Sequence, residues 1–148
     1  MNILYYLLPL LGGLAVSLQV VLNGVLEGHV GRMWTVFTSH IVGAIAAIAI
    51  LAVQFAVVGE SAGFSGFKST PWYSLFGGIF GFTIVFFVLI PTGKIPFTAI
   101  LAFVTIGQLL FGAFADHFGI FGFDKSPLTI YRVLGICAII LGGYLVKK

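Results

Sequence analysis

The stretch from Phe97 to Gly122 constrains the fold more than any other part of the chain. It stays apolar for about the 20 residues that a helix needs to cross the ~30 Å hydrocarbon core of a bilayer. A primary amide, Gln108, lies near its middle, and Asp116 and His117 follow near its end. Because an amide in hydrocarbon needs a hydrogen-bonding partner, we expect Gln108 to face protein or a water-filled cavity.

The rest of the chain is equally apolar. Hydrophobic residues make up 60% of the sequence and charged residues only 7%, whereas soluble domains carry about 25% charged residues. The apolar runs are continuous and do not alternate with polar residues as the strands of a membrane barrel do. The first run is too long for the apolar region of a cleavable signal peptide, so we expect it to be retained. The sequence therefore predicts an all-α integral membrane protein.

We predict a single five-helix transmembrane domain over residues 1–148. Polar, glycine-rich or proline-rich segments separate its apolar runs, namely Glu27 to Arg32, Glu60 to Pro71, Pro91 to Pro96, and the segment around Asp124. The predicted spans cover about residues 3–26, 34–58, 72–90, 97–115 and 128–146.

Polar and small side chains recur on single faces of these spans. Gln19 and Asn23 are four residues apart in the first span, so they share one helix face and bring hydrogen-bonding groups to it. In the fifth span, Gly135, Ala138 and Gly142 form a small-residue stripe that is typical of a packing seam.

His40 is the titratable candidate inside a span, about two turns into the second. Its ordinary pKa would suit proton exchange. The alternative is a histidine hydrogen-bonded to a neighbouring helix, which we favour.

The charged residues argue against catalysis. The acids Glu27, Glu60, Asp116 and Asp124 all fall at span ends, and the sequence shows neither metal-ligand spacing nor a nucleophile with a base. We expect no catalytic residue, no metal, no cofactor and no nucleic-acid partner. The Asp116-His117 pair has three possible roles: it caps the fourth helix, binds a cation or holds the following loop.

Basic residues give only a weak signal of orientation. With five spans, four Lys or Arg residues fall on one side of the membrane and three on the other. The excess favours an external N-terminus and a cytoplasmic C-terminus. So small a bias also permits insertion both ways, as an antiparallel homodimer requires. The alternative is one orientation with an oppositely oriented, homologous partner subunit.

Several segments resemble a known family. Gly107-Gln108-Leu109 and Ala115 through Gly122 resemble the signature of the YdcZ-type branch of the drug/metabolite transporter superfamily, and the first span with Gln19, Asn23 and Gly24 is similar to its opening helix. The resemblance covers nearly the whole chain. It implies one half of a ten-helix inverted-repeat transporter fold, located in a bacterial inner membrane and working as an antiparallel pair or with a homologous subunit.

The resemblance also bears on mechanism. Small multidrug transporters of the same superfamily carry a glutamate within the first span, where this chain has Gln19. This departure speaks against cation-for-proton exchange and favours a neutral or zwitterionic substrate, or uncoupled passage.

These observations predict a secondary transporter subunit that exports a small polar or amphipathic molecule, with membrane lipids and this substrate as its partners. We expect Gln19, Asn23, His40 and Gln108 to line a shared cavity and hydrogen-bond the substrate. Two alternatives remain. In a non-transporting scaffold or regulatory subunit, the amides would pair helix to helix without a cavity. A passive channel would need a continuous polar path.

Overall fold

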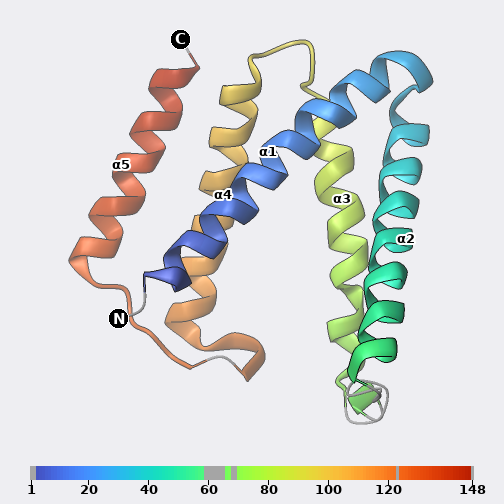
Figure 1. The fold of residues 1–148 in the computed structure, drawn as a ribbon. Coiled ribbons are helices and arrows are strands. Elements are labelled where there is room, and N and C mark those ends of the chain that lie inside the picture. Colours follow the sequence, from blue (N-terminus) through green and yellow to red (C-terminus); the bar gives the residue numbers. More distant parts are fainter. Residues whose placement is uncertain (1–2, 59–65, 68–69, 123, 148) are drawn as a thin grey trace. The chain divides into compact units, whose positions relative to one another are not determined.

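The computed structural model describes residues 3–58, 66–67, 70–122 and 124–147, so the predicted loop that begins at Glu60 lies largely outside the described residues. The described residues contain helices and no strand (Figure 1). The elements are α1 (Leu4–Val30), α2 (Arg32–Val58), the 3-10 helix η2 (Trp72–Phe76), α3 (Gly77–Leu89), α4 (Phe97–Phe118), the 3-10 helix η3 (Ile120–Gly122) and α5 (Ile130–Val146). The predicted all-α class is confirmed.

Two helices extend further than the apolar runs that predict them. α1 continues past Glu27 to Val30, and the chain then turns at Gly31, whose φ of 78° is readily adopted by glycine. α4 continues to Phe118 and ends at Gly119 in the left-handed conformation, a common helix C-cap. Polar residues therefore occupy the last turns of both helices. For this reason, a prediction from hydropathy places the C-terminal ends of these helices too early.

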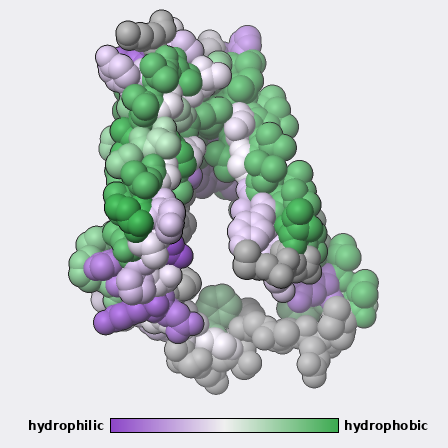
Figure 2. Space-filling model, turned by 90° about the vertical axis from the view of Figure 1, so that its left-hand side faces the viewer, coloured by the Kyte–Doolittle hydropathy of each residue, from purple (hydrophilic) through white to green (hydrophobic). Residues whose placement is uncertain are grey.

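Within the part of the chain that the structure describes, four segments are long and apolar enough to cross a membrane: α1, α2, η2 with α3, and α4. α5 is a shorter apolar helix of 17 residues. At 1.5 Å per residue it extends about 26 Å, slightly less than the ~30 Å hydrocarbon core. Hydrophobic side chains cover most of the helix surfaces in the view of Figure 2. The chain is thus an all-helical integral membrane protein.

The chain divides into two compact units, one of which spans residues 18–90. In this unit α2 and α3 lie side by side (Figure 1). Its buried side chains come from the C-terminal half of α1, the start of α2 and the end of α3, namely Val20, Asn23, Thr35, Val36, Val88 and Leu89. The core of this unit is therefore built from these three helix segments.

The other unit comprises residues 1–17 and 91–148, and α4 and α5 pack side by side within it. They approach each other closely at Gly143, where an added Cβ would lie only 2.7 Å from Cδ1 of Ile106. Pro96 precedes the first residue of α4, and Thr129 caps α5 by accepting a hydrogen bond from the backbone N–H of Arg132 at 3.4 Å. This helix pair carries the candidate site.

Candidate functional site

A groove of about 370 Å³ runs along α4 and α5. Ten residues line it: Gln108, Leu109, Gly112, Ala113 and Asp116 from α4, Leu128 from the preceding loop, and Arg132, Gly135, Ile136 and Ile139 from α5. An added Cβ at Gly112 or at Gly135 would meet no atom within 4 Å. The absence of side chains at these two positions therefore leaves the groove open.

Gln108, Asp116 and Arg132 are the polar groups of this groove. Gln108 is exposed, and its amide both donates and accepts hydrogen bonds. Asp116 and Arg132 lie at the facing ends of α4 and α5, where Nη1 of Arg132 is 3.6 Å from Oδ2 of Asp116. Both side chains are about half exposed, at 45% for Arg132 and 53% for Asp116. Such a loose, hydrated pair contributes little to stability and leaves both charges accessible.

The Asp116-His117 pair also holds the loop that leads to α5. The backbone N–H of Ser126 donates to the carbonyl oxygen of Asp116 at 2.8 Å, and the backbone N–H of Leu128 donates to Nδ1 of His117 at 3.4 Å. Nη1 of Arg132 donates to the carbonyl oxygen of Ser126 at 3.3 Å. Of the three roles predicted for the pair, the structure shows the one of holding the loop.

A second groove, of about 360 Å³, follows the same two helices. Its lining is almost entirely apolar and includes Phe114, Phe118, Ile140 and the exposed Cys137. His117 lies at its edge. Because it lacks the amide and the ion pair of the first groove, it offers a ligand little besides apolar contact.

The other three predicted site residues belong to the unit of residues 18–90. Asn23 is buried, with 8% of its surface exposed, whereas Gln19 is exposed. The structure therefore places Gln19, Asn23 and His40 in one unit and Gln108 in the other. That all four line one cavity stays a prediction.

We favoured the interpretation that His40 is hydrogen-bonded to a neighbouring helix, and the structure differs from it in one respect. Its Nδ1 lies 2.8 Å from the carbonyl oxygen of Val36, so this hydrogen bond is made within α2 and not to a neighbouring helix. The ring faces α3: its centroid is 6.0 Å from that of Phe82, and Nε2 would lie 3.9 Å from a Cβ added at Gly81. With Nδ1 bonded to this carbonyl oxygen, Nε2 is the ring nitrogen that faces α3.

An ion pair at the start of α2 was not singled out from the sequence. Nε of Arg32 donates to Oε1 of Glu27 at 2.9 Å across the turn at Gly31, and the guanidinium carbon lies 5.9 Å from the ring centroid of Phe86. The sequence signal for this ion pair was the presence of opposite charges on either side of a helix-breaking glycine. This pair fixes the connection between α1 and α2.

Sequence reasoning also missed Arg132, Gly112 and Gly135 as groove residues. On α4, Gln108, Gly112 and Asp116 recur every fourth residue, which places them on one face and was readable from the sequence. The stripe predicted as a seam on α5, Gly135, Ala138 and Gly142, does not make the close contact with α4. Gly135 lines the groove, a Cβ added at Gly142 would meet no atom within 4 Å, and the close contact is at Gly143, outside the stripe.

Among the residues that the structure describes, no three His, Cys, Asp or Glu side chains gather as a metal site would require. Comparison with protein families matched residues 4–145 to a family described as "Putative inner membrane exporter, YdcZ". The comparisons with curated proteins and with solved structures gave no match.

Proposed function

Because this chain belongs to the family described as "Putative inner membrane exporter, YdcZ", we propose that it is a subunit of a secondary transporter. In this proposal it exports a small polar or amphipathic molecule by alternating access. The family and the membrane-length helices confirm the predicted location, a multi-pass protein of the inner membrane in contact with its lipids.

The groove between α4 and α5 is the observation that carries the proposal. Its volume of about 370 Å³ falls within the range of small-molecule sites, which combine apolar walls with a few placed polar groups. Gln108 supplies an amide, Asp116 an acceptor and Arg132 a donor. A scaffold subunit would instead use its amides in contacts between helices, whereas Gln108 is exposed along this groove.

Two copies of the chain, inserted in opposite orientations, would make the working transporter. The near balance of basic residues between the two sides of the membrane supports this arrangement. A homologous subunit of opposite orientation would serve equally. In either assembly we propose that Gln19, Asn23 and His40 complete the substrate cavity together with Gln108, and that helices rock around glycine and proline positions such as Pro9.

Proton coupling through a carboxylate has no support in the helices that the structure describes. The acids of the described helices, Glu27 and Asp116, lie in last turns, and Gln19 stands at mid-span. We therefore propose a neutral or zwitterionic substrate, or passage without coupling. The passive channel is disfavoured because the described spans carry few interior polar side chains from which to build a continuous path.

Efflux from proteoliposomes tests the proposal. Liposomes are loaded with a mixture of labelled amino acids, amines, sugars and short amphiphiles, and each retained solute is quantified over time with and without a pH gradient. We expect at least one solute to leave faster than from protein-free liposomes, with a rate that saturates and does not require the gradient. Unsaturable leakage of every solute would support a channel, and retention of all solutes would support a scaffold.

A further inference from the structure

The groove between α4 and α5 has a polar end and an apolar body. Asp116 and Arg132 form the polar end, while Leu109, Ile136 and Ile139 form apolar walls. We propose that this groove binds a zwitterionic phospholipid from the surrounding leaflet, and that amphiphiles of this class are the substrates exported. The second part of this inference rests on the proposed function.

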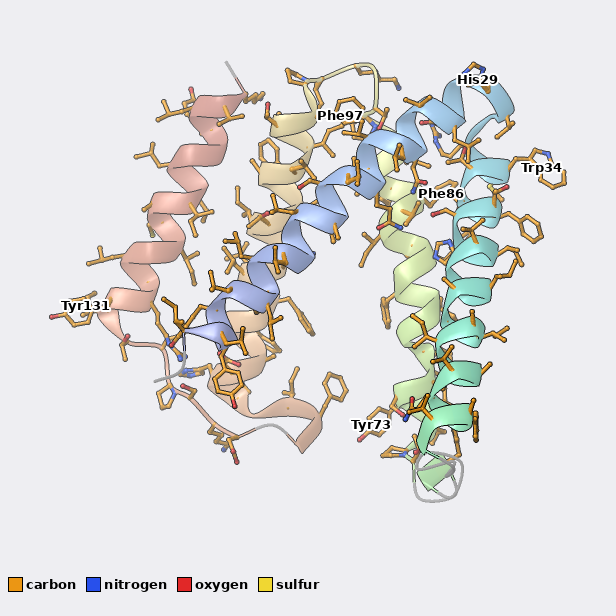
Figure 3. The ribbon with its side chains drawn as sticks, in the orientation of Figure 1. His29, Trp34, Tyr73, Phe86, Phe97 and Tyr131 are labelled. Carbon is orange, nitrogen blue, oxygen red and sulfur yellow. The ribbon has the colours of Figure 1, made fainter. Side chains whose placement is uncertain are left out.

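In this proposal, the polar end of the groove lies at the level of the lipid head groups. Asp116 is in the last turn of α4 and Arg132 is in the first turn of α5. Tyr131, next to Arg132, is 82% exposed and points away from α4 (Figure 3). Exposed tyrosine rings at helix ends prefer the membrane–water interface. A head group that contacts Arg132 would therefore stay at its ordinary depth.

The apolar body follows one leaflet. At 1.5 Å per residue, Gln108 lies about 12 Å along α4 from Asp116, and Ile139 lies about 10 Å along α5 from Arg132. One leaflet accounts for about 15 Å of the ~30 Å hydrocarbon core. An acyl chain can occupy this length while its head group remains at the interface. A water-soluble solute has no comparable use for apolar walls of this depth.

The charges at the polar end match a head group that carries both signs. The 3.6 Å between Nη1 and Oδ2 exceeds the 2.7–2.9 Å that is usual for a charge-assisted hydrogen bond. Both contacts of the Arg132 guanidinium within the described residues are made by Nη1, which leaves Nη2 for a phosphate. The Asp116 carboxylate would pair with the ammonium group. A phosphoethanolamine head group satisfies both charges, whereas a phosphoglycerol head group satisfies only Arg132.

The small residues of the groove supply a matched pair of test variants. An added Cβ at Gly135 would meet no atom within 4 Å, and Gly135 lines the groove, so Gly135→Leu should fill the space without displacing α4. Gly142 lies two turns further along α5, has equally open surroundings, and lines neither groove. Gly142→Leu therefore controls for adding the same side chain to the same helix.

Native mass spectrometry of the purified protein, with phosphatidylethanolamine or phosphatidylglycerol added in equal amounts, tests the proposal. We expect the wild type to retain phosphatidylethanolamine in preference, Gly135→Leu to lose most of it, and Gly142→Leu to retain it. Arg132→Gln should weaken retention of both lipids about fivefold, the effect of one basic residue beside an anionic head group. Asp116→Asn should remove the preference for phosphatidylethanolamine.

Three results would overturn the proposal: equal retention of the two lipids by the wild type, full retention by Gly135→Leu, or a lower dimer fraction in Gly135→Leu with unchanged lipid. The last result would assign the groove to a second copy of the chain. If water-soluble solutes are exported but the protein does not retain phospholipid as expected, this inference alone is overturned. The expected lipid retention without any transport, including transport of labelled phospholipid between leaflets, would overturn the proposed function and leave the lipid site standing.

Discussion

Gly143→Ala probes how closely α4 and α5 pack, which sets the width of the groove. The new methyl group would lie 2.7 Å from Cδ1 of Ile106 and 3.7 Å from Cβ of Ala102. Carbon atoms in good contact are about 3.5–4.0 Å apart, so Cδ1 must retreat by about 1 Å. Turning Ile106 away from its preferred rotamer costs about 0.5–1.5 kcal/mol. Replacing a helical glycine by alanine gains about 0.8–1.0 kcal/mol.

These two effects nearly cancel, so we expect Gly143→Ala alone to change the free energy of unfolding by less than about 0.5 kcal/mol. Ile106→Val removes Cδ1 and with it the clash. In that background the alanine should give its full gain, so the two substitutions should couple by about 1 kcal/mol. A double-mutant cycle measures this coupling, with unfolding in mixed micelles containing sodium dodecyl sulfate followed by circular dichroism.

Gly142→Ala provides the control for the cycle, because its methyl group would meet no atom within 4 Å. Its coupling to Ile106→Val should be no more than about 0.3 kcal/mol, the scatter of independent sites. If the effects of Gly143→Ala and Ile106→Val on the free energy of unfolding add within the same limit, α4 and α5 do not approach each other closely at Gly143. Equal coupling at both glycines would contradict this close approach as well.

The same unfolding assay checks three further predictions. Gly31→Ala should lower the free energy of unfolding by about 1–2 kcal/mol because Gly31 has a φ of 78°, whereas Gly28→Ala within α1 should raise it. If both substitutions change the free energy of unfolding in the same direction, the left-handed turn at Gly31 is refuted. Thr129→Ala should cost about 0.5–1 kcal/mol through the lost helix cap and Thr129→Ser should cost little, so equal losses would exclude a capping role. Glu27→Gln should cost about 1 kcal/mol through its partly buried pair with Arg32, and this difference should shrink in high salt; a salt-independent difference would argue against an ionic cause.

The helical fold was predictable because the physical constraint on it is severe. An apolar run in a bilayer must satisfy its backbone hydrogen bonds internally, so continuous apolar runs predict helices directly. Helix ends were less predictable, because Glu27 and Asp116 remain helical although they are charged. An α-helix tolerates acids in its last turn, and we expect these turns to reach the interface, where water solvates charged side chains.

The candidate site was predictable only in part. Gln108 was predicted to face protein or a cavity, and it lies in a groove. The pairing of Asp116 with Arg132 depends on a loop whose course is irregular, including a left-handed Phe121 with φ of 59°. Such a backbone is set by tertiary contacts and not by local preference, so no spacing rule connects the two charges. The hydrogen-bond partner of His40 was not predictable, because a histidine in a helix can also bond to its own backbone.

Substrate efflux by a Gln108 variant tests the central claim most directly, since that claim assigns the exported molecule to the groove between α4 and α5. Gln108→Leu removes the amide, while Thr105→Val removes a hydroxyl on the same helix that donates to the carbonyl oxygen of Leu101 and does not line the groove. Efflux of the solute or lipid exported by the wild type is measured for both variants at equal reconstituted amounts. We predict that Gln108→Leu loses most of the efflux and that Thr105→Val retains it. Equal rates for Gln108→Leu and the wild type would contradict the account.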